Sequence, residues 1–537
     1  MKRLQNNISK VVRGLCIFGL VTILFFGCKE QFSLDEDPSV PLLAEVPYTT
    51  MEELELGVNG IYGELRQATW MTTFYVNGWS GDDITTHRAS NKADFREYDQ
   101  RAISGENSRT AGSWRGAYRT IRQANSVLAN IEGVEFADTD QQNRLVGEAH
   151  FLRAIMFHHL ARIHGRIPLP LSPIPDAELT LASQVEVYEQ IESDLLMAES
   201  LLPDLYPGVN NGAARPNSGS ARALLARLYL DWAGFPVSDN AKYGMAASSA
   251  KQVIDNASSH GFGLVADPED VWTIANRFNE EGVFTVAFCR PCGLANRKFG
   301  KLSLPTDYGG WQETFAEIRF FEDFPEQPRK DATYHSFLAI DDNGNPTGDA
   351  SAAVDTVGWN EFRDQLNPLF KKVTGHISDN LWIEFQTDRN DFWMRYAEVL
   401  LIYAEASGRS GSVTADAWEA LNMVRRRAEN LPVDTPDPSV DITSGDIAEL
   451  TFTEKKWELA GEYLRWYDLV RMQRVEEALS ERDPQVSTGT IFNADGTTTE
   501  FDIREPSNPI LGSLGTDNYF VPIPPREIEF YQSLSGN

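Results

Sequence analysis

The sequence predicts a mainly α-helical protein, built from tetratricopeptide-like helical hairpins and carrying an irregular, loop-rich and partly β insertion. The first observation is residues 395–406, RYAEVLLIYAEA, which contain no Gly or Pro and only three polar side chains. A helix that is apolar around most of its circumference is buried among other elements. The second observation is a glycine-containing turn at 408–411, followed by another helical pattern over 415–428. These two segments predict a helical hairpin that packs against further helices.

The charged residues of this hairpin allow two predictions about their surroundings. Arg395 and Glu398 are three residues apart and lie on one helix face, so we expect them to satisfy each other as a buried pair. Arg425, Arg426 and Arg427 end the second helix, where cations suit the negative end of the helix dipole.

Helical periodicity is the third observation, and it recurs through the first half of the chain. Its paired spacing, at intervals of about 35 to 45 residues, is typical of helical-hairpin repeats. The predicted helices are 50–67, 114–131, 140–164, 185–202, 220–233 and 241–256, with a further helix at 453–477 near the other end. The segment 68–113 shows no helical period and is expected to be a functional loop.

The pattern changes between residues 261 and 390, which we expect to form the insertion. Residues 281–288 are typical of a short strand, and the polar cluster 341–348 is typical of a hairpin tip. We therefore expect one domain over 48–537, with an N-terminal helical part (48–260), the insertion (261–390) and a C-terminal helical part and tail (391–537).

The first 27 residues are typical of a secretory signal peptide. Four basic residues precede an apolar run that ends before Cys28, and no acidic residue occurs before Glu30. The run is too short to be a spanning helix. Its end resembles the bacterial lipobox, so we expect Cys28 to be lipidated and residues 28–47 to form a tether. The protein would then be anchored to a membrane without spanning it.

Composition excludes some partners. The chain has 78 acidic and 48 basic residues, a formal net charge of −30. Such a charge disfavours nucleic acid, whose phosphates it repels. Cys289 and Cys292, in the sequence CRPC, allow a local disulfide, free thiols or a redox pair. A zinc site is disfavoured because no second cysteine pair exists.

Motifs for catalysis or metal binding are absent from the sequence. Asp82 and Asp83 are adjacent, so on an extended segment they point to opposite sides and do not by themselves flank a glycosidic bond. The histidines at 158, 159 and 164 miss the spacing of a zinc helix and are expected in the core or on the surface. The acidic cluster 341–345 resembles a calcium loop in composition but lacks its terminal Glu. We expect no cofactor, and a structural calcium ion is allowed but not indicated.

Binding of a sugar is better supported by the residue types. A sugar presents C–H faces and hydroxyl edges, which suit flat aromatic rings beside polar groups. One candidate loop contains Trp79, Asp82 and Asp83 and extends to Tyr98, and a second contains Tyr308 and Trp311. The alternative is that these tryptophans pack their loops onto the helical frame. The tryptophans at 114, 418 and 457 follow helical periods and are expected in the core.

Five motifs occur in an order that resembles the SusD/RagB family of bacterial surface glycan-binding lipoproteins. They are HFLRAIMFHHLARIHGRIPL, ARALLARLYL, RYAEVLLIYAEA followed by AWEALNMVRRRA, EKKWELAGEYLRWYDLVRM and VPIPPREI, and they span about residues 51–528. One departure is that Lys455 and Lys456 stand where the family often has Arg, at a structural salt bridge. The family places its glycan sites in loops at positions corresponding to the two candidate loops.

The resemblance implies a function and a location. The protein would be an outer-membrane, cell-surface lipoprotein that captures a glycan or oligosaccharide and passes it to a TonB-dependent SusC-like transporter, without catalysis. Two other classes stay open, a surface glycan hydrolase and a helical-repeat scaffold that binds only protein. Some members of the family handle peptides, which leaves the ligand class open.

Overall fold

The computed structural model describes most of the chain beyond the tether. The described residues are 48–86, 92–131, 134, 138–208, 214–296, 302, 311, 313–344, 347, 351–361, 367–375, 387–480, 487–492, 496–503 and 509–531. Residues Thr49–Asn537 belong to one compact unit. The predicted signal peptide, the tether and Cys28 lie outside the described residues, as does Tyr308. Within the described ranges, every helix is too short or too polar to cross a bilayer.

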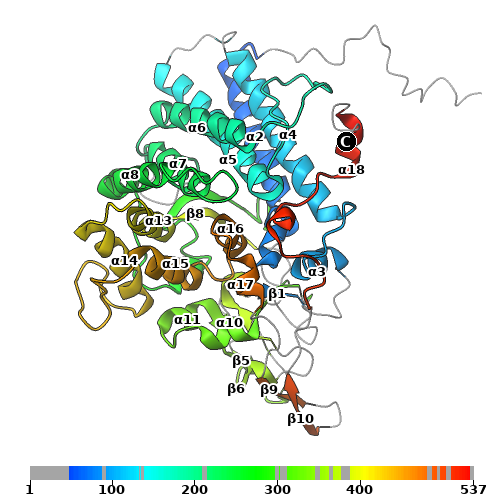
Figure 1. The fold of residues 1–537 in the computed structure, drawn as a ribbon, viewed down its shortest axis with the longest axis vertical. Coiled ribbons are helices and arrows are strands. Elements are labelled where there is room, and N and C mark those ends of the chain that lie inside the picture. The colour runs from blue at the N-terminus through cyan, green and yellow to red at the C-terminus, as the bar shows by residue number, and fades with distance from the viewer. Residues whose placement is uncertain are drawn as a thin grey trace, which may run out of the picture. The chain divides into compact units, whose positions relative to one another are not determined.

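Helices dominate this unit, which confirms the prediction of a mainly α fold (Figure 1). The α-helices are α2 (Met51–Thr69), α3 (Ala93–Asp99), α4 (Ser108–Asn130), α5 (Thr139–His164), α6 (Gln184–Leu201), α7 (Ser218–Ala233), α8 (Lys242–Asp255), α9 (Ala257–His260), α10 (Ile318–Asp323), α11 (Pro328–Thr333), α12 (Lys371–Thr374), α13 (Tyr396–Arg409), α14 (Ala415–Ala428), α15 (Ile447–Glu458), α16 (Arg465–Arg471), α17 (Val475–Ser480) and α18 (Pro525–Phe530). Short 3₁₀ helices are η1 (Trp70–Ser80), η3 (Asp270–Trp272), η6 (Trp359–Glu361) and η8 (Thr516–Asn518).

The first six long helices follow the predicted periodicity and pack in sequence order. Helices α5, α6, α7 and α8 each lie beside the next, and α2 lies beside α4 (Figure 1). Helix α4 begins six residues earlier than predicted, because the side chain of Asn107 accepts hydrogen bonds from the backbone N–H groups of Arg109 and Thr110. Helix α6 begins with a capping box, in which Ser183 and Glu186 bond each other's backbone.

Helix α13 is buried along most of its length, as its all-round apolar sequence predicts, and α14 and α15 pack against it. The predicted Arg395–Glu398 pair is wrong. Arg395 instead contacts Glu281 (2.6 Å) and Glu462 (2.6 Å), and Arg227 from α7 donates to Glu398 (2.7 Å). Arg395 and Glu398 are close in sequence, but each forms its hydrogen-bonded ion pairs with oppositely charged groups from other elements.

The helix predicted over 453–477 is also wrong, since three shorter helices take its place. The chain bends at Gly461 and Tyr463, which have positive φ angles of 73° and 64°. At Gly461 an added Cβ would lie 2.5 Å from the ring of Phe370, so this close approach requires glycine. Lys455, at the position of the family departure, forms a buried ion pair with Asp468 (2.8 Å). A salt bridge is therefore present at this position, and it is formed by lysine where the family often has arginine.

Strands are short and pair two by two among the described residues. They are β1 (Ile84–Thr85) with β3 (Phe315–Ala316), β2 (Gly282–Val286) with β8 (Asp391–Arg395), β4 (Tyr334–His335) with β7 (Leu369–Phe370), β5 (Phe337–Ile340) with β6 (Asp355–Gly358) and β9 (Ser487–Phe492) with β10 (Thr498–Ile503), all antiparallel. The strand predicted over 281–288 corresponds to β2. The turn cluster at 341 follows β5 directly, as expected for a hairpin tip.

The three clustered histidines are all buried, as the core alternative predicted. His158 contacts Asp231 (2.8 Å), His159 contacts Ser113 (2.8 Å), and His164 contacts the backbone carbonyl of Val521 (2.9 Å). Burial lowers the pKa of His159 to about 3 and that of His164 to about 4, so both are neutral at pH 7. Each contact joins a different pair of elements, which is a structural role.

Candidate functional site

The structure brings the first predicted glycan loop against the residues that directly follow the second loop. Strand β1, which follows the first loop, pairs with β3, which follows the second, with Ile84 opposite Ala316. The indole N–H of Trp79 donates to the backbone carbonyl of Glu313 at 2.7 Å, and the backbone N–H of Glu317 donates to the carbonyl of Asp83 at 3.1 Å. The first loop and the residues around 313 therefore form one structural unit.

Trp79 lies at the centre of this unit and has no exposed surface. Its ring stacks on Phe95, with centroids 4.5 Å apart, and contacts Tyr463 at 5.0 Å. Tyr98 is also fully buried, and its hydroxyl lies 2.7 Å from the hydroxyl of Thr110. Burial raises the pKa of Tyr98, which keeps the phenol neutral. Neither ring offers a face on which a sugar could stack.

Asp82 and Asp83 differ sharply in environment although they are adjacent. Asp82 is half-buried and accepts two hydrogen bonds from Arg465, at 2.8 and 3.3 Å. Burial pushes its pKa upward, but Arg465 and Lys456 outweigh burial and hold the pKa below the ordinary value. Asp83 is fully buried and accepts one hydrogen bond from the backbone N–H of Gly461, at 3.0 Å.

The charge on Asp83 is poorly compensated. Its Oδ1 atom has no hydrogen-bond partner. Burial raises the pKa of Asp83 to about 7, and the neighbouring carboxylate of Asp82 contributes to the rise. A buried acid near neutral pH is sometimes catalytic. Here the carboxyl faces Gly461 inside the protein and has no exposed surface, so the raised pKa reflects burial at a loop junction.

Asp82 and Trp311 lie at the edge of this unit. Trp311 is half-buried and packs against the aromatic cluster that contains Trp79. Asp82 lines a small polar hollow of about 30 Å³ together with Lys456, Arg319 and Asp323. The side chains of Trp79, Asp83 and Tyr98 are enclosed, so the expectation of direct glycan contact does not fit their geometry here. Asp82 and Trp311 have the exposure that such contact requires.

Several residues that shape the site were missed from the sequence. Phe95 stacks on Trp79, Tyr463 contacts the ring of Trp79, Arg465 holds Asp82, and the guanidinium of Arg109 lies 4.9 Å from the ring centroid of Phe95. No spacing signal marks these residues, because Tyr463 and Arg465 lie in a segment predicted to be a continuous helix. The motif GEYLRWYD identified them only as part of the family pattern.

A second hollow lies further inside, between η1, α5, α7 and β8. Tyr75, Trp393, Arg162 and Arg227 are among its lining residues, and its volume is about 60 Å³. One water needs roughly 10–15 Å³ in this measure, so the hollow has room for a few waters and not for a sugar ring. Its charged groups are paired, for example Arg162 with Asp231 at 3.2 Å. We assign it no ligand.

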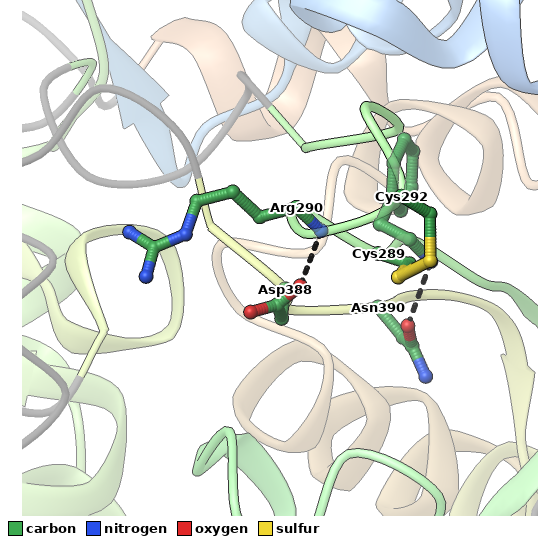
Figure 2. The surroundings of a disulfide bond; sticks show 6 residues. Cys289, Arg290, Cys292, Asp388 and Asn390 are labelled. Carbon is green, nitrogen blue, oxygen red and sulfur yellow. Dashed lines mark hydrogen bonds between the residues drawn. A yellow bond between two sulfur atoms is a disulfide. The ribbon is translucent and has the colours of Figure 1, made fainter.

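The two cysteines of the insertion are joined in a disulfide (Figure 2). Cys289 and Leu294 form a β-bridge, so the bond closes the tip of a small exposed hairpin. The hairpin is held to the segment before β8, where the backbone N–H of Arg290 donates to Asp388. Among the described residues, no group of three or more His, Cys, Asp or Glu side chains is arranged to hold a metal ion.

Two family models match the chain. The model described as "Starch-binding associating with outer membrane" matches residues 34–230, and the model described as "SusD family" matches residues 339–537. A relative, SusD-like protein P25 of Formosa agariphila, is 24% identical over 86% of this chain and 90% of its own length.

Solved structures agree with these matches. A SusD homolog from Bacteroides thetaiotaomicron superposes with a TM-score of 0.71 at 22% identity, covering 91% of this chain and 97% of its own. A laminarin-binding SusD-like protein superposes with a TM-score of 0.68 at 24% identity, covering 90% and 98%. The fold is thus that of SusD-like proteins. Together with the two family models, which match residues 34–230 and 339–537 and so cover most of the chain, this assigns the chain to the SusD/RagB family.

Proposed function

We propose that the protein captures a glycan or oligosaccharide at the cell surface and delivers it to a TonB-dependent SusC-like transporter of the outer membrane. The observation that carries the proposal is that the chain belongs to the SusD/RagB family. One solved structure that is similar to this chain is that of a laminarin-binding SusD-like protein. The predicted signal peptide and lipidated Cys28 support a location on the membrane surface, with residues 28–47 as the tether.

Capture would be non-covalent. We place the binding surface at the second loop, where half-buried Trp311 would offer a ring face and Tyr308 a second one. Asp82, which is half-buried at the end of the first loop, would add a hydrogen-bond acceptor. Trp79, Asp83 and Tyr98 would act indirectly, by holding the loops in place. Because release must follow capture, we expect affinities of about millimolar to micromolar, or about −4 to −8 kcal/mol.

The first test is retardation of residues 29–537, which contain the whole compact unit, in native gels cast with a panel of polysaccharides. We expect retardation by at least one glycan and its loss in Trp311→Ala. The matched control is Trp418→Ala, which removes another half-buried tryptophan from α14. Equal retardation of both variants would contradict the assignment of Trp311. Indifference of every variant to all glycans would favour a peptide ligand or a protein-binding scaffold.

Two further measurements separate the other parts of the proposal. The pure protein should release no reducing sugar from a glycan that it binds, whereas a hydrolase would release it. The lipidated protein, purified from its native membrane, should retain a SusC-like transporter, and Cys28→Ala should abolish its membrane attachment. Absence of the transporter from the purified material would contradict the delivery step.

A further inference from the structure

The hairpin formed by β5 and β6 carries an exposed aromatic ring. Phe337 begins β5 and keeps 66% of its surface accessible, whereas its neighbour Leu338 is 1% exposed. Successive side chains of a strand point to opposite faces, so the hairpin has one packed face and one solvent face. The two strands lie at the lower end of Figure 1, away from α5–α8. The ring of Phe337 belongs to the solvent face.

The packed face anchors the hairpin beside the second glycan loop. Leu338 forms a small apolar cluster with Phe315 and Leu369. Phe315 begins β3, four residues after Trp311. Trp359, which directly follows β6, packs against this cluster and also against the larger aromatic cluster that Trp311 contacts. The hairpin is therefore held in place next to the proposed binding surface, with its exposed ring on the side away from β3.

The facing strand leaves the ring uncovered. Phe337 lies opposite Gly358 in the antiparallel register. The backbone N–H of Trp359 donates to the carbonyl of Ser336 at 3.1 Å, which makes Phe337 and Gly358 a non-hydrogen-bonded pair. The two strands approach each other most closely at such pairs. Since Gly358 has no side chain to place over the ring, the ring stays open to a ligand.

The chemistry around the ring suits an uncharged sugar. The next pair on the same face is Ala339 opposite Thr356, two small residues, and Thr356 is exposed and offers a hydroxyl. Residues 334–360 contain four Asp and no Lys or Arg, and Asp342 and Asp355 are exposed. Carboxylates accept hydrogen bonds from sugar hydroxyls and repel an anionic ligand. A flat ring, small neighbours and acidic surroundings together favour a neutral glycan.

The apolar area of the hairpin is too small for a stable protein partner. Among the described residues of the hairpin, the exposed large hydrophobic side chains are Phe337 and Val354. Burying one aromatic side chain covers about 150–250 Å². A stable protein interface takes about 800 Å² from each partner. The negative charge of the hairpin likewise disfavours an anionic membrane surface. One ring with small neighbours matches a single sugar unit better than either.

From these observations, and resting on the proposed function, we propose that Phe337 is a second stacking platform, which holds an uncharged sugar unit of the same polysaccharide chain that binds at Trp311. The ring stacks on the C–H face of the sugar, and Thr356 adds a hydrogen bond. Two weak contacts on one chain reinforce each other, because the second one forms within the complex. A short saccharide occupies one platform at a time and gains no such advantage. The protein therefore favours long chains over their fragments.

A comparison of long and short ligands tests this platform. Native gels cast with starch, laminarin or xyloglucan give the affinity of residues 29–537 for each polymer, and calorimetry gives the affinity for the matching disaccharide. Phe337→Ala should weaken binding of the polymer by about fivefold and leave binding of the disaccharide at Trp311 unchanged. Phe337→Trp keeps a stacking face and should retain the affinity for the polymer. Phe530→Ala is the matched control, because Phe530 is an exposed phenylalanine of α18, 46% accessible.

Each other outcome would overturn the platform in a different way. Equal polymer affinity of the wild type and Phe337→Ala would refute it and leave capture at Trp311 standing. Equal weakening for polymer and disaccharide would mean that Phe337 and Trp311 form one contact. If none of the three neutral polysaccharides retarded the wild type, the platform would be refuted. Retardation by acidic alginate would then still support the proposed function, and its absence as well would count against both proposals.

Discussion

Two regions, the buried ion network around α13–α15 and the glycan loops, contain buried residues of types that are expected at the surface. In the network, Glu281, Arg395, Arg427 and Glu458 are nearly inaccessible although all are charged. In the loops, aromatic and acidic residues that resemble a binding surface, such as Trp79, are also enclosed. Burial in both regions depends on the partners that each polar side chain finds, and residue type alone does not decide it.

The two regions differ in how completely they are satisfied. Glu458 contacts three guanidinium groups, those of Arg329, Arg395 and Arg427. Burial opposes its ionisation, but the three arginines hold the pKa of Glu458 well below its ordinary value. Asp83, by contrast, has a raised pKa and one oxygen without a hydrogen bond. The carboxylate of Glu458 is thus well compensated, whereas the loop junction carries an uncompensated group, Asp83, next to Asp82 of the proposed binding surface.

The largest expected effect is that of Glu458→Gln, which breaks the network. Three buried arginines lose their shared carboxylate, and an uncompensated buried charge of this kind costs about 3–5 kcal/mol. Chemical denaturation measures the change in the free energy of unfolding. The control is Glu64→Gln, in the exposed pair with Arg119, where about 1 kcal/mol or less is expected. Equal effects of the two variants would show that the network does not stabilise the protein as a unit.

The two tryptophans of the loops should respond differently. Trp79→Ala removes a fully buried ring and its hydrogen bond to Glu313, so we expect a loss of about 3–5 kcal/mol. Trp311→Ala removes a half-buried ring and should cost roughly 1–2 kcal/mol. Thermal and chemical unfolding compare the two variants. If Trp311→Ala destabilised the protein as much as Trp79→Ala, Trp311 would have to be counted as a core residue.

The last prediction concerns the pH dependence caused by Asp83. Its pKa is raised from the ordinary 3.8 to about 7, so between pH 4 and pH 7 the folded state binds more protons than the unfolded state. Stability from this group therefore falls as pH rises, by about 1.4 kcal/mol per pH unit at most, and the loss is complete above pH 7.

Asp83→Asn should remove that dependence. Its free energy of unfolding relative to the wild type should increase by about 3 kcal/mol or less between pH 5 and pH 8. Urea denaturation of both proteins at several pH values measures this difference, in which the contributions of all other titrating groups cancel. A difference that is constant with pH would mean that Asp83 is ionised in the folded protein throughout this range.

The sequence by itself determined the helical frame and the family. Periodicity located α2 and α5–α8 to within a few residues, and it gave both bounds of α14 correctly. It could do so because a helix is specified by neighbours three and four positions away. The ordered motifs identified the SusD/RagB family, which the family models and the fold confirm. Local rules failed at α4, where a side-chain cap begins the helix early, and at 459–464, where a buried ring and a glycine break it.

The tertiary structure decided the surroundings of the candidate site. Arg465 holds Asp82 across 383 residues of chain, Gly461 holds Asp83 across 378, and the carbonyl of Glu313 holds Trp79 across 234. No periodicity reaches over such separations, so the sequence identified loops of suitable composition without showing which of their side chains turn inward. Composition and spacing report neighbours along the chain, whereas exposure and charge compensation depend on neighbours in space.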